Sequence, residues 1–286
     1  MIRHHPMPSQ SQHCIHRCPS TPWAELRVSA NTRDCYRAHT HGEYSVGIVD
    51  QGSATFHHPS GPHNVKAGSV VLIEPDVVHS CNPVSGHIWS YRMLFIEATW
   101  LHNAVTQALG LVTPPDGLEF MSRCIEAPSI ALLVDQLCQP FDSASAARAL
   151  TMELPTWLAG LARAGKPVDC THVPSELVPA VVTMQTECEN HITVRGLADT
   201  CGMSNSQFIR RFQAAFGMTP GRYLQNSRIN GARRLLSQGV ALADAAHTMG
   251  FADQAHMQRA FKAHHAMTPG DYRIGRSRLS RLNHHD

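Results

Sequence analysis

Four side chains that could hold a metal ion lie in two short stretches of the N-terminal half. His39, His41 and Glu43 alternate along one stretch, and His79 lies in the other. Three neutral imidazoles and a carboxylate would suit Zn, Mn, Fe or Ni. The same side chains could instead form hydrogen bonds within the protein, or they could contact an organic molecule at the open end of a small β domain. We favour this second interpretation, so the sequence predicts neither a resident metal nor another cofactor.

A second set of polar side chains occurs in two copies of one sequence pattern near the C-terminus. Gly202 and Gly250 lie 48 residues apart, whereas Arg210 and Arg259 lie 49 apart. The second copy therefore carries one extra residue directly after its glycine. An internal repeat indicates one supersecondary unit used twice. Each copy has the two helices and the glycine turn of a helix-turn-helix unit, so sequence-specific DNA binding is the leading hypothesis.

The second helix of each unit presents the side chains that would reach a DNA groove. In the first unit these are Asn205, Ser206, Gln207, Ile209, Arg210 and Arg211. In the second unit they are Gln254, Ala255, His256, Gln258 and Arg259. Arginine can pair with guanine, asparagine and glutamine with adenine, and small side chains with the thymine methyl group. For Arg210 and Arg259, an ion pair within the domain or a phosphate contact is an equally strong alternative.

Start and stop signals for helices are dense around these units. Ser204 is an expected N-cap, and Gly217 is expected to end the helix that Ser204 begins. Thr219-Pro220 then starts a long helix to about Ser237, because proline is favoured in the first turn. At 1.5 Å per residue this helix is about 27 Å long. It can hold the two units so that they enter successive major grooves, about 34 Å apart.

Apolar spacing predicts which residues of this half are buried. The expected core comprises Phe212, Leu235, Leu236, Phe251 and Phe261. A further helical apolar pattern covers residues 177–189 and runs through Val178, Val181, Val182 and Met184. Residues that recur three or four positions apart share one face of a helix, so each pattern predicts a buried stripe.

The N-terminal half is dominated by strand-like segments between residues 43 and 95. Short β-branched and aromatic runs there are separated by glycine, proline and aspartate turns, which is typical of a sandwich or barrel. Tyr44, Trp89 and Tyr91 could line an apolar ligand pocket together with the histidines. Helical patterns follow at 98–110 and 128–164.

Composition limits the class of the protein. The chain has 286 residues, enough for two domains, and 43% of them are hydrophobic, which excludes a disordered chain. Residues 175–286 carry 13 basic residues against 8 acidic ones, and 12 of the 13 are arginine, which suits phosphate and guanine contacts. Nine scattered cysteines without a CxxC pair favour reduced thiols and a cytoplasmic location. No apolar run is long enough to span a membrane.

The C-terminal pattern resembles the AraC/XylS family of bacterial transcription regulators. The resemblance rests on the order and spacing of Gly202-Met203-Ser204, Arg210-x-Phe212, Thr219-Pro220, Gly250-Phe251 and Thr268-Pro269. It implies a domain of helices that contains two helix-turn-helix motifs. Ala255 and Met257 depart from the serine and phenylalanine more usual in the family, so contacts there can differ while helix packing survives.

The N-terminal pattern resembles the two motifs of the cupin barrel, in the version that serves AraC-type regulators as a ligand-binding domain. His39, His41, Glu43 and His79 match the ligands of metal-binding cupins by kind. However, the spacing from His41 to Glu43 is shorter than in that pattern, and the second motif lacks the usual glycine after Pro75. The expected fold is therefore α+β and multidomain, with a cupin-like β-barrel, flanking helices and an all-α C-terminal domain. The histidines, Glu43 and the aromatic residues named above are the expected effector-binding residues.

These resemblances predict an organisation and a set of partners. The expected parts are a disordered tail (1–20), a cupin-like effector-binding and dimerisation domain (21–164), a linker (165–174), a double helix-turn-helix DNA-binding domain (175–276) and a second tail (277–286). We expect a non-enzymatic regulator, more often an activator acting through RNA polymerase, that binds double-stranded promoter DNA and a small-molecule effector as a homodimer. Two alternatives stay open: a metal-dependent cupin enzyme fused to a DNA-binding module, and a regulator whose barrel only dimerises.

Overall fold

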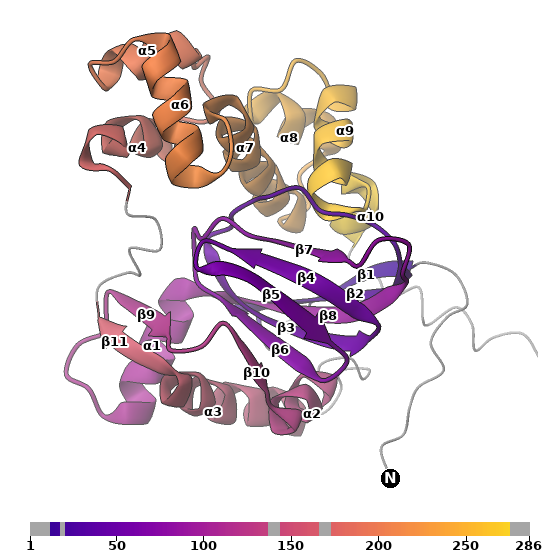
Figure 1. Ribbon diagram of the computed structural model, residues 1–286. Coiled ribbons are helices and arrows are strands. Elements are labelled where there is room, and N and C mark those ends of the chain that lie inside the picture. The colour runs from indigo at the N-terminus through magenta and orange to yellow at the C-terminus, as the bar shows by residue number, and fades with distance from the viewer. Residues whose placement is uncertain (1–11, 18–20, 137–143, 166–172, 275–286) are drawn as a thin grey trace, which may run out of the picture.

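Antiparallel sheets form the N-terminal domain, and the helical C-terminal domain packs against one end of it (Figure 1). The computed structural model describes residues 12–17, 21–136, 144–165 and 173–274. The larger sheet has the strand order β1-β2-β8-β3-β6-β10, the smaller sheet has the order β5-β4-β7, and β11 pairs with β9. The strands are β1 (Gln12–Arg17), β2 (Ala24–Thr32), β3 (Glu43–Gln51), β4 (Ser53–His58), β5 (Gly61–Lys66), β6 (Ser69–Ile73), β7 (Ser80–Pro83), β8 (Trp89–Glu97), β9 (Gly117–Phe120), β10 (Cys124–Glu126) and β11 (Ala162–Gly165).

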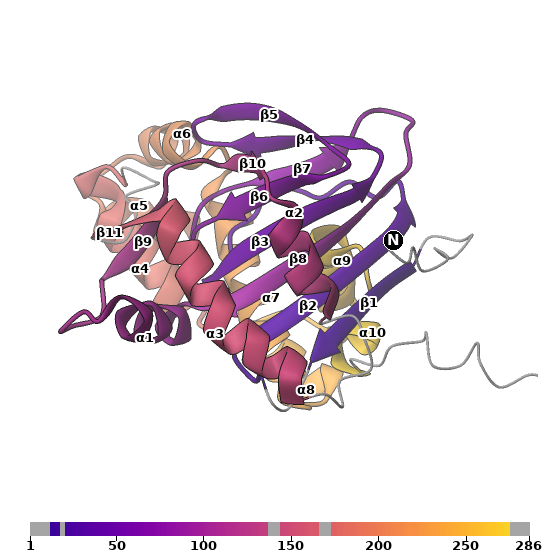
Figure 2. The ribbon, with the colours of Figure 1, turned by 90° about the horizontal axis from the view of Figure 1, so that it is seen from below.

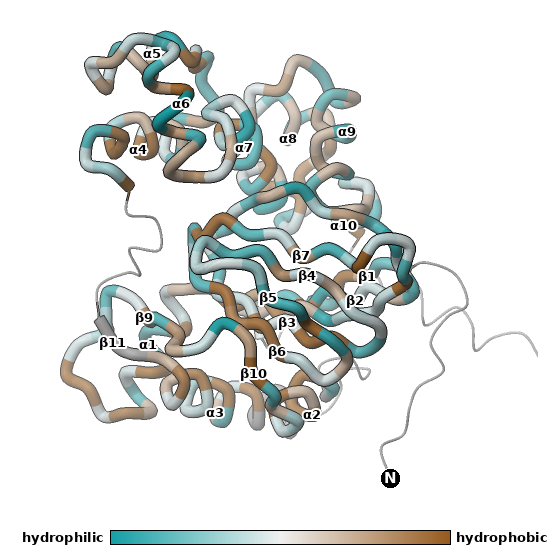
Figure 3. The backbone as a smooth tube through the Cα atoms, viewed as in Figure 1, coloured by the Kyte–Doolittle hydropathy of each residue, from teal (hydrophilic) through white to brown (hydrophobic). Residues whose placement is uncertain are grey.

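Both faces of the larger sheet are covered, so β3, β6 and β8 are buried along most of their length. Val70 and Leu72 of β6 pack toward the helices α1 (Ala98–Leu109), α2 (Pro128–Gln136) and α3 (Ala144–Leu161), whereas Val71 and Ile73 pack toward the smaller sheet. Successive side chains of a strand point to opposite faces, so one strand supplies two cores. Figure 2 shows α3 lying across the outer face of this sheet, and Figure 3 shows the apolar stretches of β6 and β10.

The C-terminal domain contains the two helix-turn-helix units. Its elements are the 3-10 turn η1 (Ser175–Leu177) and the helices α4 (Val178–Thr186), α5 (Val194–Thr200), α6 (Asn205–Phe216), α7 (Pro220–Ser237), α8 (Leu242–Thr248), α9 (Gln254–His265) and α10 (Pro269–Ile274). The expected caps are confirmed. Ser204 and Gln207 form a capping box at α6, Gly217 ends α6 with φ 64°, and the Thr219 side chain accepts from the Arg222 N–H at α7.

The expected core of this domain is also largely confirmed. Phe212, Leu236 and Phe261 are fully buried, Phe251 is 7% exposed, and Leu235 is partly buried at the edge of the same cluster. Along residues 177–189 the prediction is half right. Val181 and Met184 are buried, but Val178 and Val182 are 43% and 49% exposed, because they lie on the outer side of the short helix α4.

Three sequence-based expectations about local structure need correction. Part of the expected N-terminal tail is strand β1, whose residues pair with β2 and place Ile15 in the core of the C-terminal domain. The helical patterns expected over 128–164 are confirmed by α2 and α3, but their last residues form strand β11, which pairs with β9; residues 137–143 lie outside the described part of the chain. Gly165, the first residue of the expected linker, is therefore in a sheet; residues 166–172 and 275–286 lie outside the described part of the chain. At β11, pairing with the distant strand β9 overrides the local helical propensity.

Within the described residues, no helix is long and apolar enough to cross a membrane.

Candidate nucleic-acid interface and effector cavity

The two recognition helices present corresponding side chains from corresponding positions. α6 begins after Ser204, and α9 begins after Asp253, whose side chain accepts from the His256 N–H at 2.6 Å. The extra residue of the second repeat lies between Gly250 and this cap. Both helices therefore keep the same register, and Arg210 and Arg259 each occupy the sixth position.

Most predicted DNA-contacting residues lie on the exposed faces of these helices. Asn205, Ser206, Gln207, Arg210, Arg211, Gln254, Ala255 and Arg259 are exposed, and Ile209, His256 and Gln258 are half-buried. Met257 replaces an aromatic residue of the first unit, Phe208, and both side chains are fully buried. Met257, which departs from the family pattern, is therefore a core residue and does not contact DNA.

Arginine side chains on α6 and α9 have different partners. Arg211 forms a 2.8 Å ion pair with Glu176 of the same domain. Neither Arg210 nor Arg259 forms an ion pair with any described residue. The alternative of an intradomain ion pair therefore fits Arg211, and Arg210 and Arg259 have their guanidinium groups available for phosphate or base contacts. Arg210 also lines a shallow surface depression together with Ser206, Ile209, Gln213 and Ala214.

A cavity of about 60 Å³ lies between the barrel and the C-terminal domain. The barrel contributes most of its lining, and Asn230, Arg233, His264 and His265 contribute from α7 and α9. Five of the predicted effector-binding residues line it, namely His39, His41, His79, Trp89 and Tyr91. The cavity is therefore walled by both domains.

The other two predicted effector-binding residues lie elsewhere. Tyr44 is on the opposite face of β3, where its hydroxyl bonds to His102 Nε2 at 2.9 Å and accepts from the Leu118 N–H at 2.8 Å. Glu43 lies at the domain interface, where its carboxylate pairs with Arg233. Glu43 and Tyr44 are adjacent in β3, and adjacent side chains of a strand point to opposite faces of the sheet. They therefore cannot both face one cavity.

Polar groups in the cavity wall form a partly satisfied network. Tyr91 donates its hydroxyl hydrogen bond to Tyr36 at 2.6 Å, and Arg27 donates to Tyr36 at 3.0 Å and to the His265 carbonyl. Among the described residues, Arg27 Nε, Arg233 Nε and Trp89 Nε1 are buried without a hydrogen-bond partner. Buried donors of this kind cost free energy unless a partner binds, so the cavity favours a ligand that accepts hydrogen bonds.

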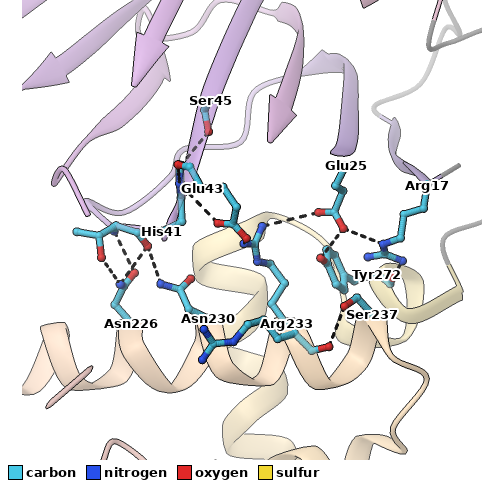
Figure 4. A network of polar contacts seen from close by, with 12 residues as sticks. Arg17, Glu25, His41, Glu43, Ser45, Asn226, Asn230, Arg233, Ser237 and Tyr272 are labelled. Carbon is cyan, nitrogen blue, oxygen red and sulfur yellow. Dashed lines mark hydrogen bonds and ion pairs between the residues drawn. The ribbon is translucent and has the colours of Figure 1, made fainter. Parts of the chain in front are cut away.

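Helix α7 holds the C-terminal domain on the barrel through one polar face (Figure 4). Asn226, Asn230 and Arg233 lie four and three residues apart, which places them on one side of the helix. Asn226 donates to the Thr40 hydroxyl at 2.8 Å and accepts from the Thr40 N–H, and Asn230 donates to the Thr40 carbonyl at 2.8 Å. Arg233, 5% exposed, pairs with Glu43 and lies 3.7 Å from a Glu25 oxygen.

A second contact joins strand β1 to the end of the chain. Arg17 pairs with Glu25 at 2.8 Å and donates to the Tyr272 carbonyl at 3.1 Å, and the Tyr272 hydroxyl donates to Glu25 at 2.6 Å (Figure 4). Glu25 therefore links β1, β2, α7 and α10. Together the two contacts attach α7 and α10 of the DNA-binding domain to the barrel.

Three histidines meet at the polar end of the cavity. His39 and His79 form an antiparallel bridge with N–H···O distances of 3.0 and 2.9 Å, which brings the two motifs together. One ring nitrogen from each of His39, His41 and His79 lies within 4.8 Å of those of the other two. Burial lowers the pKa of His39 to about 4 and holds the pKa values of His41 and His79 well below 6.5, so all three are neutral at physiological pH.

Four cavity residues from the distant half, together with Arg27 and Tyr36, were not predicted from the sequence. Nothing in the local pattern around His264 or His265 marks them, because they face the barrel only after the domains pack. Arg233 is the exception, since it lies three and seven residues after Asn230 and Asn226. A polar stripe on an otherwise apolar helix is a signal of a second interface.

The geometry defines a two-domain DNA-binding regulator, and comparisons with known proteins agree. The family model for the AraC-like ligand binding domain matches residues 22–159, and the model for a helix-turn-helix domain matches residues 197–274. The chain therefore belongs to the AraC-type transcriptional regulators, as the sequence resemblance predicted.

Relatives that align with both domains bear regulator names. The chain is 25% identical to the uncharacterized HTH-type transcriptional regulator YbfI of Bacillus subtilis over 228 residues, covering 77% of this chain and 80% of that one. It is 24% identical to the RCS-specific HTH-type transcriptional activator RclR of Escherichia coli, covering 82% and 87%. It is 22% identical to the lactose operon transcription activator of Staphylococcus xylosus, covering 79% and 82%. These relatives do not favour the alternative of a cupin enzyme.

A solved structure shares the two-domain fold. The crystal structure of ToxT from Vibrio cholerae with a bound unsaturated fatty acid superposes with a TM-score of 0.55 at 11% sequence identity, covering 95% of this chain and 97% of that one. The predicted fold class, a cupin-like barrel followed by a double helix-turn-helix domain, is confirmed.

Proposed function

We propose that this regulator binds promoter DNA through α6 and α9 and that a small molecule in the interdomain cavity controls this binding. The observation that carries the proposal is the composition of the cavity wall, which joins five predicted barrel residues to Asn230, Arg233, His264 and His265. A ligand that touches both domains has different affinities for the packed and separated arrangements. Such a difference is what a ligand needs in order to shift the equilibrium between them.

The size of the cavity supports the same mechanism. Pockets for organic ligands typically measure about 300–1,000 Å³, whereas this cavity measures about 60 Å³. An organic effector therefore requires the interface between α7, α9 and the barrel to open. ToxT, which shares the fold, is described with a bound fatty acid. An effector that accepts hydrogen bonds would suit the unpartnered Arg27, Arg233 and Trp89 donors.

On the DNA side, we propose direct contacts from the exposed residues of the two recognition helices. Support comes from the equal register of α6 and α9 and from the guanidinium groups of Arg210 and Arg259. We propose transcription activation through RNA polymerase as the mode of action, because two of the relatives are named as activators. We also propose a cytoplasmic, non-enzymatic protein with the domain boundaries expected from the sequence, apart from β1 and Gly165.

A homodimer is the proposed assembly, formed through the helices outside the barrel. Leu109 at the end of α1, Leu132 of α2 and Met152 of α3 are each more than half exposed, and a second copy of the chain that packed on these helices would bury them. Sedimentation of the purified protein would test this assembly. A dimer that Leu132→Asp and Met152→Asp convert to a monomer supports the proposal, and a monomeric wild type contradicts it.

The experiment that tests the function is sequencing of DNA fragments that the purified full-length protein retains from its host's genome, at physiological salt. We expect discrete sites of about two helical turns, since two units would occupy successive major grooves. Candidate effectors inferred from neighbouring genes would then be tested for a change in operator affinity. Uniform, salt-sensitive retention of all fragments would contradict sequence-specific regulation.

A further inference from the structure

The two helix-turn-helix units touch each other directly, in addition to their common attachment to α7. Figure 1 shows α5 and α6 on one side of α7, and α8 and α9 on the other. Gly250 forms the turn between α8 and α9, and it lies against the backbone of Glu189, in the connection from α4 to α5. A Cβ on Gly250 would lie 2.5 Å from the Glu189 carbonyl oxygen, so the two backbones meet with no side chain between them. We call this contact the joint between the units.

Arg228 of α7 holds the joint on one side. Its Nε donates to the Cys188 carbonyl at 2.7 Å, and its Nη2 donates to the Asn190 carbonyl at 2.9 Å. The same Nη2 would lie 3.3 Å from a Cβ on Gly250. The guanidinium group therefore bridges the carbonyls on either side of Glu189 and lies beside the glycine turn. Hydrogen bonds from a charged donor are stronger than those between neutral groups, which makes Arg228 an effective clamp.

Met249 holds the joint on the other side. This buried residue precedes the glycine turn and packs against Gly231 of α7, where a Cβ would overlap the terminal methyl group of the Met249 side chain. Glycine is a poor helix former, but here it lets the turn approach the helix closely. The turn that leads into α9 is therefore fixed between α7 and the α4–α5 connection.

The joint lies on the side of α7 that faces away from the barrel. Successive residues of a helix are about 100° apart, so Arg228 points roughly 200° away from Asn226. The Asn226 amide donates to the Thr40 hydroxyl of the barrel at 2.8 Å. A substitution of Arg228 should therefore leave the contact between α7 and the barrel in place.

We propose that Arg228 determines which spacing between two DNA half-sites the protein accepts. It is a positioning residue, because it acts through α6 and α9 and touches no base. This role rests on the proposed DNA contacts of α6 and α9. One base pair changes the separation of two half-sites by about 3.4 Å and their relative rotation by roughly 35°. A rigid joint favours one spacing, since two linked binding units gain most when their connection matches the span between their sites.

Loss of the Arg228 hydrogen bonds leaves α7 as the common support but no longer holds the joint closed. The α4–α5 connection can then move away from the α8–α9 turn, and the recognition helices reach half-sites at neighbouring spacings. Binding at the best spacing weakens, because the joint must be ordered when DNA binds. A substitution that only destabilised the domain would weaken binding at every spacing by the same factor. Spacing preference therefore separates a positioning role from a structural one.

The test is selection of binding sites by the purified full-length protein from duplexes with a random segment of about 30 base pairs, which holds two half-sites one helical turn apart. Sites selected by wild type should share one spacing. Arg228→Met should select the same half-sites at two or more spacings. Arg222→Met changes an exposed arginine of the same helix and, as the matched control, should keep the single spacing.

Affinities for a selected site with one base pair inserted or removed between the half-sites give the size of the effect. This change should weaken binding at least about tenfold for wild type and less than about threefold for Arg228→Met. Arg228→Lys keeps the charge but cannot bridge two carbonyls with a planar fork, so it should fall between them. Circular dichroism shows whether each variant folds, and Arg228→Lys carries the comparison if Arg228→Met does not.

Four results would decide against this role or against its basis. A single wild-type spacing selected by folded Arg228→Met and Arg228→Lys overturns the role of Arg228 and leaves the proposed function standing. A loss of affinity by the same factor at every spacing also overturns it and identifies a phosphate contact or a purely structural residue. A wild type that accepts all spacings equally overturns it as well. A wild type that selects no sequence from the pool contradicts the proposed function itself.

Discussion

Arg210 and Arg259 show how a repeat in the sequence becomes a pair of equivalent side chains in space. The second turn absorbs its extra residue before the Asp253 cap, so both arginines stay at the same position of their helices. Gly250 has φ 67°, and a Cβ there would lie 2.5 Å from the Glu189 carbonyl oxygen. Only glycine makes this turn at no steric cost, so the glycine fixes how α9 leaves α8.

Replacing Arg259 with alanine should weaken binding to a cognate operator by about 1–3 kcal/mol if this arginine reads a base. Its guanidinium group has no ion pair among the described residues, so the loss would come from DNA contacts. Fluorescence anisotropy with a cognate operator and a scrambled duplex provides the measurement, with Lys66→Ala, an exposed basic residue of the barrel, as the control. An equal loss on both duplexes would identify a phosphate contact instead.

Some site residues can be predicted from local sequence patterns, whereas others are defined only by contacts between segments far apart in the chain. The repeat in the sequence is sufficient to identify the exposed residues of α6 and α9. The His39-x-His41 spacing suggests that these two side chains share one face, but it does not exclude Tyr44, because the sequence does not say which face is the cavity. Arg27 and His265 could not be predicted, since they meet only when segments more than 200 residues apart pack together.

At the scale of elements, α7 has two faces with different tasks. Leu236 and Ile229 lie in the core of the C-terminal domain, and Asn226, Asn230 and Arg233 face the barrel. Helical periodicity predicted the first face correctly. The sequence patterns predicted strands only between residues 43 and 95 and missed β1, β2, β9, β10 and β11. β11 is a short strand that pairs with β9, far earlier in the chain, and such pairing leaves little local trace.

Leu236→Ala should lower the free energy of unfolding by roughly 2–5 kcal/mol, because the removed atoms come from a fully buried side chain. Chemical denaturation monitored by circular dichroism would measure this change. Val182→Ala removes an apolar side chain of the same domain that is 49% exposed, and it should cost far less. Similar losses for the two variants would show that the core of this domain is not centred on α7.

Arg233→Met should release α7 from the barrel, because it leaves Glu43 without its buried cation, whereas Glu25 keeps its ion pair with Arg17. Breaking a buried pair by removing one partner costs about 3–5 kcal/mol, and the partial exposure of Glu43 places the expected loss at the lower end. Arg233→Met without effector should show a change in operator affinity in the same direction as the change that effector binding causes in wild type. Arg234→Met changes the exposed neighbour and should alter neither quantity. If Arg233→Met keeps both the stability and the effector response of wild type, the Arg233 contact does not control the domains.

At the scale of the whole molecule, the packed arrangement buries histidines from both domains around one cavity. His39, His41 and His79 come from the barrel, and His264 and His265 come from α9. Desolvation lowers the pKa of each of them, to about 4 for His39 and about 3 for His264. The packed interface between the domains therefore stabilises the neutral form of these histidines relative to the protonated form.

This burial makes stability depend on pH in a defined direction. Between the unfolded pKa near 6.5 and the lowered folded pKa, the unfolded chain binds protons that the folded protein does not, so stability rises with pH across this window. The contribution of His264 is fully present above pH 6.5 and is lost progressively as the pH falls toward about 3. Each histidine with a fully shifted pKa contributes up to about 1.4 kcal/mol per pH unit.

Thermal unfolding between pH 7.5 and pH 5 should therefore show a falling melting temperature, with a smaller slope for His264→Asn than for wild type. Buried carboxyls whose pKa is raised, such as Asp50 and Glu74, act in the opposite direction, but they are the same in both proteins and cancel in the comparison. His191→Asn alters an exposed histidine of the C-terminal domain and should keep the wild-type slope. Identical slopes for His264→Asn and wild type would mean that His264 is hydrated in solution, and hence that the barrel and α9 are separated rather than packed.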